Sequence, residues 1–325
     1  MHKLCRLLGA LALLLPALSQ AAGDAGSCRY IPIAKIPVEF PDGAHQATVN
    51  GSINGTPVRM LVDTGAHSSQ LMRASAERLG LPLTASGAYS YGVGGASVTY
   101  LTHVNDFALG DSHAGKTLMA VIGNVATRVP HDAIVGADFL LQTDMELSLK
   151  EKFLQFFRAS GCADTILSYW DPDAMEIPFT GKLEGSNQPL VTVELNGVKL
   201  RALIDTGASI SVVRRHAAEL AGVKLDGPDV RKAGRIAGVG DELLDSWVVD
   251  FKRFSIGDET VNNPRLTVMD DSPQGRDQID VLLGTDFLRA HRVLFAMSQD
   301  RLYLSYLGGE LFGAAQQAPA PSKAP

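Results

Sequence analysis

Two aspartates occupy the same short motif in the two halves of this 325-residue chain. Residues 61–66 read LVDTGA and residues 203–208 read LIDTGA, so Asp63 and Asp205 each follow an apolar run and precede a Thr-Gly turn. Such a turn can present a carboxylate in a cleft. Two carboxylates in contact share one proton and can activate water, because both cannot ionise cheaply. The motifs therefore predict hydrolysis by activated water, with Asp63 and Asp205 as the catalytic pair.

The similarity between the two halves extends well beyond these turns. Asn-Gly pairs at residues 54–55 and 196–197 share the offset of the aspartates, 205 − 63 = 142. The offset then rises to 254 − 107 = 147 and to 284 − 136 = 148, which indicates small loop insertions in the second half. Several blocks in one order, twice, predict an internal duplication. The later blocks are residues 91–94 with 237–240, 107–111 with 254–258, and 134–140 with 282–288.

Local patterns predict mostly β structure. Short apolar runs are broken by Gly, Pro, Asn and Asp, which is typical of strands and turns. The Asn-Gly pairs predict two β-hairpins, each leading into one aspartate. The hairpin strands are expected at residues 47–53 with 58–62 and at residues 190–195 with 198–204. A duplicated β-domain whose Asp-Thr-Gly turns are only structural is the alternative interpretation.

A few short helices are expected between the strands. One is predicted at residues 75–79 and one at residues 216–220, each ended by a glycine. Asp138 and Asp286 follow a glycine and precede apolar residues, so we expect each to cap a helix at its N-terminus. Their expected role is therefore structural.

The Asp-Thr-Gly-Ala motifs, the Gly-rich hairpin tips and the later apolar-apolar-Gly blocks resemble the pattern of retropepsin-like aspartic peptidases. The resemblance covers residues 45–160 and 188–307. In that family each unit is a closed β-domain, the Asp-Thr-Gly loops of two units meet, and a flap covers the cleft. Retroviral members dimerise, whereas pepsin-like enzymes build the pair within one chain. The resemblance implies an all-β fold, with two tandem retropepsin-like acid-protease β-barrel domains that form a bilobal cleft.

The resemblance also implies roles for the residues that follow each aspartate. Thr64 and Thr206 would hydrogen-bond across the two loops and hold the catalytic pair in place, although simple turn filling is the alternative. Gly65 and Gly207 would let the backbone approach the carboxylates, where a Cβ would clash. These four residues are therefore expected to support the pair.

Two glycine-rich stretches are expected to form flaps that bind substrate. Tyr91, Gly92 and Gly94 belong to the first flap, and Gly238 and Gly240 belong to the second. Flexible tips suit a lid that opens for substrate and then excludes water. A phosphate-binding glycine loop is disfavoured, because neither stretch has the dinucleotide spacing.

Several other positions near the motifs also have expected roles. Ala66 and Ala208 carry no hydroxyl that could donate to the carboxylates, so we expect a pair that works at mildly acidic to near-neutral pH. His67 could line the cleft on one side, but the favoured interpretation is that it faces solvent. Gly136 and Gly284 are expected to be structural, permitting close backbone approach behind the pair.

Composition and missing motifs argue against other classes of function. The formal net charge is −6 with dispersed Lys and Arg, which disfavours nucleic acid as a partner. The histidines do not cluster and the chain has no His-Glu-x-x-His, so we expect no metal. It also contains no Gly-x-Ser-x-Gly and no Cys-x-x-Cys. The expected partner is a peptide or protein substrate, and no cofactor is expected.

The N-terminal region is typical of a secretory signal. Lys3 and Arg6 precede the apolar run at residues 7–15, and residues 19–21 offer a small-residue cleavage site. The run is too short for a comfortable membrane span. We therefore expect export to the periplasm or secretion, and an uncleaved membrane anchor is the alternative.

Signal removal leaves two cysteines, Cys28 and Cys162, which flank the first repeat. In an oxidising compartment they could form one disulfide that closes the first domain. Two separate buried thiols are the alternative.

We therefore expect an exported aspartic endopeptidase. It would act as a monomer in which Asp63 and Asp205 form an intramolecular dyad, and it would have no stable membrane span. One alternative is a catalytically inactive pseudoprotease that binds peptides in the same cleft. Another is a chain whose halves pair with a second chain. The predicted segments are a signal peptide (1–22), a first retropepsin-like domain (23–158), an interdomain linker (159–187), a second retropepsin-like domain (188–312) and a disordered tail (313–325).

Overall fold

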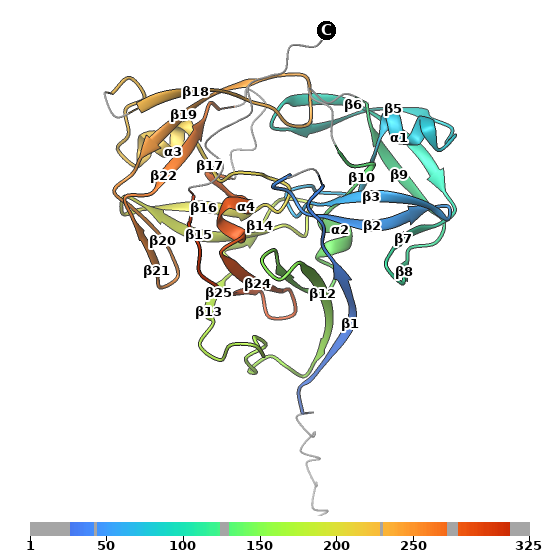
Figure 1. Cartoon of the computed structure of the whole chain (residues 1–325), viewed down its shortest axis with the longest axis horizontal. Helices are drawn as coiled ribbons and strands as arrows, with labels where there is room; N and C mark the ends of the chain where they lie inside the picture. Colours follow the sequence, from blue (N-terminus) through green and yellow to red (C-terminus); the bar gives the residue numbers. More distant parts are fainter. Residues whose placement is uncertain (1–26, 42–43, 124–129, 228–229, 272–278, 313–325) are drawn as a thin grey trace, which may run out of the picture.

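The two halves of the chain form two β-lobes that stand on one shared sheet (Figure 1). The predicted signal peptide and the predicted tail lie outside the described residues. Among the described residues, no helix is long and apolar enough to cross a bilayer. The structure, a computed structural model, describes residues 27–41, 44–123, 130–227, 230–271 and 279–312.

The first lobe is a nine-stranded sheet with two short helices. Its strands are hydrogen-bonded in the order β5-β6-β9-β4-β10-β3-β2-β7-β8. The elements are β2 (Thr48–Ile53), β3 (Thr56–Val62), β4 (Gln70–Met72), α1 (Arg73–Arg78), β5 (Thr84–Gly92), β6 (Gly95–Val104), β7 (Phe107–Leu109), β8 (Ser112–His113), β9 (Thr117–Ile122), β10 (Ala133–Val135) and α2 (Ala137–Leu140).

The second lobe repeats this path strand for strand. Its order is β18-β19-β22-β17-β23-β16-β15-β20-β21, with β14 paired to β15 as an addition. The match confirms the predicted duplication. The elements are β14 (Gly181–Lys182), β15 (Pro189–Leu195), β16 (Val198–Ile204), β17 (Val212–Arg214), α3 (Arg215–Leu220), β18 (Val230–Ile236), β19 (Leu244–Asp250), β20 (Arg253–Ile256), β21 (Glu259–Asn262), β22 (Arg265–Met269), β23 (Val281–Leu283) and α4 (Thr285–Leu288).

Both predicted hairpins are present. Asn54 and Gly55 have φ of 50° and 76°, and Asn196 and Gly197 have φ of 52° and 85°. Two consecutive residues with positive φ make the tight turn that matches the twist of paired strands. Each turn fixes the register of the strand that ends at an aspartate.

The two predicted short helices are also present, slightly earlier than expected. α1 starts at Arg73 and α3 at Arg215, because each helix follows its preceding strand without a loop. Gly80 and Gly222 end these helices with φ of 66° and 83°, which is the left-handed conformation that glycine allows.

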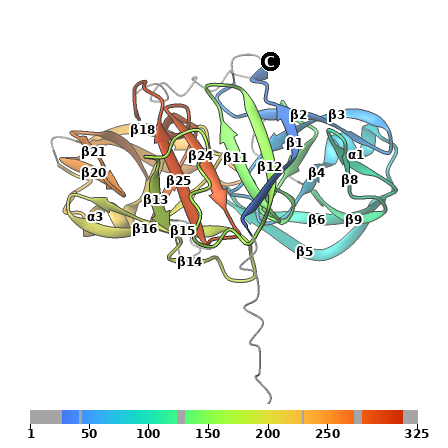
Figure 2. The same cartoon turned by 90° about the horizontal axis from the view of Figure 1, so that it is seen from below.

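A six-stranded sheet joins the two halves; it lies below the lobes in Figure 1 and toward the viewer in Figure 2. Strands β11 and β24 pair in its centre, so neighbouring strands come from opposite halves. β13 and β14 lie inside the region expected as a linker, and the predicted domain boundaries stay a prediction. The sheet order is β1 (Arg29–Pro37), β12 (Phe153–Ser160), β11 (Asp144–Ser148), β24 (His291–Ala296), β25 (Arg301–Tyr306) and β13 (Met175–Pro178).

The hydrophobic core reaches the strand ends that carry the two aspartates. Val62 and Val135 are buried beside Asp63, and Ile204 and Leu283 are buried beside Asp205. All four belong to one cluster that extends through both lobes. Because close-packed interiors resist deformation, this cluster gives the two motif loops a rigid base.

Cys28 and Cys162 form a disulfide across 134 residues, at the end of the sheet where β1 pairs with β12. The pairing resolves the alternative left by the sequence. We expect the double substitution Cys28→Ser/Cys162→Ser to lower the free energy of unfolding by about 3–5 kcal/mol, because so long a closed loop restricts the unfolded chain. Urea unfolding measures the change. Reductant should lower the midpoint of the wild type but leave the double variant unchanged, and equal midpoints without reductant would contradict the prediction.

Candidate active site

The two aspartates lie at equivalent ends of equivalent strands. Asp63 follows β3, and its N–H donates to the carbonyl of Val135 at the end of β10, at 3.0 Å. Asp205 follows β16, and its N–H donates to the carbonyl of Leu283 at the end of β23, at 2.9 Å. In both lobes the two strands are parallel, so the aspartate leaves the sheet between two strand ends.

Each carboxyl group lies over the glycine of the opposite loop. A Cβ placed on Gly65 would be 2.4 Å from Cγ of Asp205. A Cβ placed on Gly207 would be 2.3 Å from Cγ of Asp63. No side chain larger than hydrogen fits at either position without displacing a carboxyl. The structure therefore brings Asp63 and Asp205 together and accounts for the glycine of both motifs.

The two threonines hold the loops by a reciprocal set of buried hydrogen bonds. Thr64 Oγ1 donates to the carbonyl of Ile204 at 2.7 Å and accepts from the N–H of Thr206 at 3.1 Å. Thr206 Oγ1 donates to the carbonyl of Val62 at 2.7 Å and accepts from the N–H of Thr64 at 2.9 Å. Each threonine thus binds the opposite lobe, as the family resemblance implied, and neither only fills a turn.

Burial is the largest cause that raises the pKa of both dyad carboxyls. The negative charge of Asp205 and a hydrogen bond to it raise the pKa of Asp63 further, well above its ordinary value. Asp205 Oδ1 accepts the N–H of Gly207 at 2.9 Å and of Ala208 at 3.1 Å, and these bonds oppose the rise in its pKa. Over the range in which the pair shares one proton, one carboxyl is therefore protonated and the other carries the negative charge.

The alanines after the motifs contribute through the backbone. The N–H of Ala66 donates to Asp63 Oδ1 at 2.9 Å, in the position that mirrors Ala208. These bonds lower the pKa values, but burial outweighs them. The pH range in which the pair works stays a prediction. His67 is exposed, as the favoured interpretation held.

The two flap hairpins, β5–β6 and β18–β19, meet tip to tip above the loops (Figure 1). The N–H of Gly94 donates to the carbonyl of Val239 at 2.9 Å, and the N–H of Glu242 donates to the carbonyl of Gly94 at 2.8 Å. Gly240 has φ of 106°, and a Cβ there would be 2.0 Å from the carbonyl oxygen of Gly94. The tips are therefore in backbone contact, which only glycine permits.

Each flap tip also carries a valine that packs on the opposite lobe. Val239 of the second flap packs against a first-lobe cluster, and Val93 of the first flap packs against a second-lobe cluster. A Cβ on Gly92 would be 2.7 Å from Cβ of Val239, and a Cβ on Gly238 would be 2.7 Å from Cβ of Val93. The clusters are Leu61, Met72, Ile122 and Ile134 in the first lobe and Val212, Leu244 and Met269 in the second.

Tyr91 differs from the other flap positions. It lies in β5, but 56% of its surface is exposed, so the opposite tip does not cover it in this closed arrangement. The structure brings Gly92, Gly94, Gly238 and Gly240 to the tip contact and leaves Tyr91 outside it.

The prediction that Asp138 and Asp286 are helix N-caps is wrong. The glycine before each helix is the N-cap, so both aspartates lie within the first turn. Asp286 Oδ1 accepts the N–H of Ser211 at 2.7 Å and its hydroxyl at 2.6 Å. Asp138 Oδ1 accepts the N–H and the hydroxyl of Ser69, each at 2.8 Å. The carboxylates therefore anchor the segments that follow the Asp-Thr-Gly loops.

The glycines before these helices permit a close backbone contact. A Cβ on Gly136 would be 2.5 Å from the carbonyl carbon of Ser68, and a Cβ on Gly284 would be 2.5 Å from that of Ile210. Their predicted structural role is confirmed.

Two glutamines that were not predicted from the sequence contact the motif loops. Gln46 Nε2 donates to the carbonyl of Gly207 at 2.5 Å, and Gln188 Nε2 donates to the carbonyl of Thr64 at 2.9 Å. Their separation, 188 − 46 = 142, equals that of the aspartates. Extending the repeat upstream of the Asn-Gly pairs would have found them.

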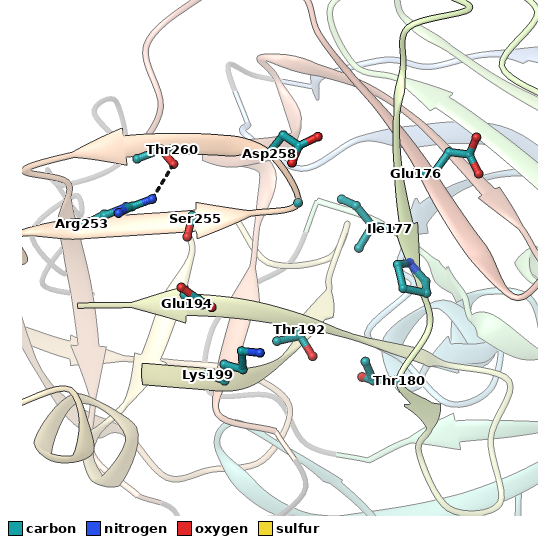
Figure 3. Close-up of a pocket in the computed structure, with 12 residues that line it drawn as sticks. Glu176, Ile177, Thr180, Thr192, Glu194, Lys199, Arg253, Ser255, Asp258 and Thr260 are labelled. Carbon is teal, nitrogen blue, oxygen red and sulfur yellow. Dashed lines mark hydrogen bonds between the residues drawn. The ribbon is translucent and has the colours of Figure 1, made fainter. Parts of the chain in front are cut away.

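A cavity of about 530 Å³ lies elsewhere, in the second lobe beside β13 (Figure 3). Its lining includes Glu194 and Lys199, which are cross-strand partners, and Arg253, which donates to Thr260 Oγ1 at 3.3 Å. No motif or flap residue lines it, so it is separate from the dyad. Within the described part of the chain, no group of three or more His, Cys, Asp or Glu side chains could hold a metal ion.

The sequence pattern of the aspartyl protease family matches residues 49–139 and again residues 191–287. The chain belongs to this family. The two matched segments contain Asp63 and Asp205 respectively, so the repeat seen in the aspartyl protease sequence is a repeat of the family unit itself.

Solved structures similar to this aspartyl protease include the aspartic proteinase from Irpex lacteus and basic 7S globulin from soybean. The first is 14% identical, covers 86% of this chain and 97% of its own, and has a TM-score of 0.47. The second is 13% identical, covers 86% of this chain and 96% of its own, and has a TM-score of 0.45. No curated protein sequence matches the chain.

Proposed function

We propose that this aspartyl protease is an endopeptidase in which Asp63 and Asp205 activate one water molecule between them. The observation that carries the proposal is the placement of each carboxyl against the glycine of the opposite loop. The threonine bonds support it, because they fix the loops in the one relative position at which the carboxyls meet. One chain supplies both aspartates, so the proposed active form is a monomer.

The proposed first step divides the work between the two carboxyls. Ionised Asp205 takes a proton from water as the water oxygen attacks the scissile carbonyl carbon. Protonated Asp63 donates its proton to the carbonyl oxygen, which gives a tetrahedral diol. The assignment of the proton to Asp63 is part of the proposal: burial raises the pKa of both carboxyls, and the charge of Asp205 raises that of Asp63 further.

In the proposed second step the diol collapses and both carboxyls return to their starting states. Asp205 gives the proton it accepted to the leaving nitrogen, and the C–N bond breaks. One diol hydroxyl returns its proton to Asp63 as the new carboxyl group forms. No acyl-enzyme is formed, and the products are a free amine and a carboxylic acid.

The closed flaps support a peptide substrate held in an extended conformation. The tips meet over the loops through two backbone hydrogen bonds, so a chain lying across the dyad must displace or replace contacts at the tips. Closure over a bound peptide would then exclude water other than the attacking molecule. The valines at the tips pack against one apolar cluster in each lobe.

We also propose that the protein works after export, in the periplasm or outside the cell. The disulfide between Cys28 and Cys162 supports an oxidising compartment. N-terminal sequencing of protein from fractionated cells tests this proposal. A mature N-terminus near residue 23 in an exported fraction supports it, and full-length protein in the cytoplasm contradicts it, while an intact N-terminus in membranes indicates an anchor.

We expect the pH–rate profile to be bell-shaped with its maximum at mildly acidic to near-neutral pH. Activity rises as Asp205 ionises and falls as Asp63 loses its proton, and burial raises the pKa of both groups. The rate of cleavage of one peptide between about pH 3 and 8 measures the profile. A maximum confined below about pH 4, near the values of unperturbed carboxyls, contradicts the expectation.

Cleavage of a mixed peptide library by the purified protein tests the function itself. The library is incubated across the same pH range, and the products are identified by mass spectrometry. Cuts within peptides support an endopeptidase and reveal the preferred sites. Peptide binding without any cut would support the pseudoprotease alternative.

A further inference from the structure

Two glutamines bind the Asp-Thr-Gly loops from outside, each across the boundary between the lobes. Gln46 directly precedes the first-lobe hairpin, and its amide Nε2 donates to the carbonyl of Gly207 in the second lobe at 2.5 Å. Gln188 directly precedes the second-lobe hairpin, and its Nε2 donates to the carbonyl of Thr64 in the first lobe at 2.9 Å. The two glutamines thus occupy equivalent positions in the repeat, and each donates to the loop of the other lobe.

The amide of Gln188 is itself fixed. Its side chain is fully buried, and its Oε1 accepts the hydroxyl of Ser186 at 3.0 Å. The same hydroxyl accepts the N–H of Gln188 at 3.1 Å. With the oxygen occupied by a donor, the amide nitrogen is turned toward Thr64, so this bond is a built contact and not one of several rotamers.

The segment before Gln46 is held by a different device. Arg289, which follows α4 in the second lobe, donates through Nη2 to the carbonyls of Ala44 and His45 at 3.3 and 3.2 Å. Its guanidinium also lies 4.8 Å from the ring centroid of Phe40. The second lobe therefore holds this segment at two points, through Arg289 just before Gln46 and through Gly207 at Gln46 itself.

The glutamine bonds and the threonine bonds act on different parts of each loop. The threonine hydroxyls bind the carbonyls of Val62 and Ile204, which precede the aspartates. The glutamine amides bind carbonyls that follow the aspartates, at Thr64 and Gly207. Each loop is thereby held by the opposite lobe before and after its carboxyl, and this double attachment limits rotation of the loop about the threonine contact.

We propose that Gln46 and Gln188 are positioning residues that hold the two Asp-Thr-Gly loops at the separation at which Asp63 and Asp205 share one proton. The catalytic meaning of this inference rests on the proposed endopeptidase function. The sharing of the proton does not, because the titration of the carboxyls can be followed whether or not a peptide is cut.

The test replaces each glutamine by methionine, which keeps the length of the side chain and removes the donor. The variants are Gln46→Met, Gln188→Met and the double substitution. Gln142→Met is the matched control, because Gln142 Nε2 donates to the carbonyl of Asp138 at 2.6 Å at an exposed site within one lobe. Carboxyl ¹³C shifts of aspartate-labelled protein give the two apparent dyad titrations, with Asp63→Asn and Asp205→Asn identifying the signals.

We expect the interval between the two titrations to narrow in each glutamine variant and to narrow most in the double variant, because loosened loops let the charges move apart. We expect kcat to fall by about 10-fold or more per substitution with KM changed less, since misplaced reacting groups slow the chemical step. The bell-shaped pH–rate profile should become narrower along with the interval between the titrations. The Gln142→Met control should keep the wild-type interval, kcat and bell.

Gln46→Glu adds a rescue measurement, because a protonated carboxyl can donate to the carbonyl of Gly207 and an ionised one cannot. The ratio of the variant's kcat to that of the wild type should therefore fall as pH rises. The same ratio for Gln46→Met should show no recovery at low pH.

The outcomes separate this inference from the proposed function. If the wild type cuts peptides and the methionine variants keep the wild-type titration interval, the inference is overturned and the function stands. If thermal stability falls while the interval and kcat stay unchanged, the glutamines are only structural and the inference is again overturned. If the wild type cuts nothing but the interval narrows in the variants, the positioning role stands and the endopeptidase proposal fails.

Discussion

Replacing either dyad aspartate by asparagine should reduce kcat for peptide cleavage by at least about 10³-fold, because each carboxyl supplies a separate proton transfer. Asparagine keeps the shape of the side chain but can neither accept the proton of water nor donate an acidic proton. Asp63→Asn and Asp205→Asn should therefore fail to the same degree, and the double variant should be little worse than either. The rate with a peptide selected from the library measures the effect. Asp111→Asn, at an exposed turn, is the matched control and should keep wild-type activity.

Measuring the thermal stability of Asp63→Asn across pH shows whether unfolding causes such a loss of activity. Burial and the charge of Asp205 raise the pKa of Asp63, so its stabilising contribution is complete below the pKa of the unfolded chain and is lost as pH rises through the folded pKa. Asparagine does not ionise and escapes this loss. The melting temperature of Asp63→Asn relative to the wild type should thus increase with pH. Activity retained in only one of the two variants would show that the halves do not cooperate.

The sequence predicts the parts of this fold that depend on local chemistry. Asn54-Gly55 and Asn196-Gly197 specify their turns because both residues adopt positive φ, and the apolar residues beside them specify the strands that end at the aspartates. The internal repeat then predicts the same elements in the second half. The same strand order in the two lobes follows from that duplication.

The parts that the sequence did not predict depend on contacts between distant segments. β11 and β24 pair across the two halves, yet nothing in either strand alone indicates its partner. Asp286 follows a glycine like an N-cap, but a serine hydroxyl and N–H from 75 residues away compete for its carboxylate. The contacts of the flap valines with the opposite lobes also join distant segments. They form only when the two lobes are assembled.

Gly207→Ala should reduce kcat by about 10²-fold or more through the aspartate of the other lobe. The new Cβ would be 2.3 Å from Cγ of Asp63, so that carboxyl has to move, and displacements of about 1 Å cost this much in a positioned site. Gly65→Ala should reduce kcat in the same way through Asp205, because its Cβ would be 2.4 Å from Cγ of Asp205. Kinetics on folded, purified variants measure both effects.

Gly115→Ala is the control that separates displacement from strain. Gly115, between β8 and β9, has φ of 65° and its Cβ would meet nothing within 4 Å, so alanine there strains the backbone without touching the dyad or the glutamine contacts. It should lower stability and leave kcat unchanged. The decisive feature of the motif variants is their crossed effect: Gly207→Ala should disturb the carboxyl titration of Asp63 more than that of Asp205, and Gly65→Ala should do the reverse. If each substitution instead disturbs the aspartate of its own loop, the carboxyls do not lie across the boundary between the lobes, and no shared proton joins the two repeats.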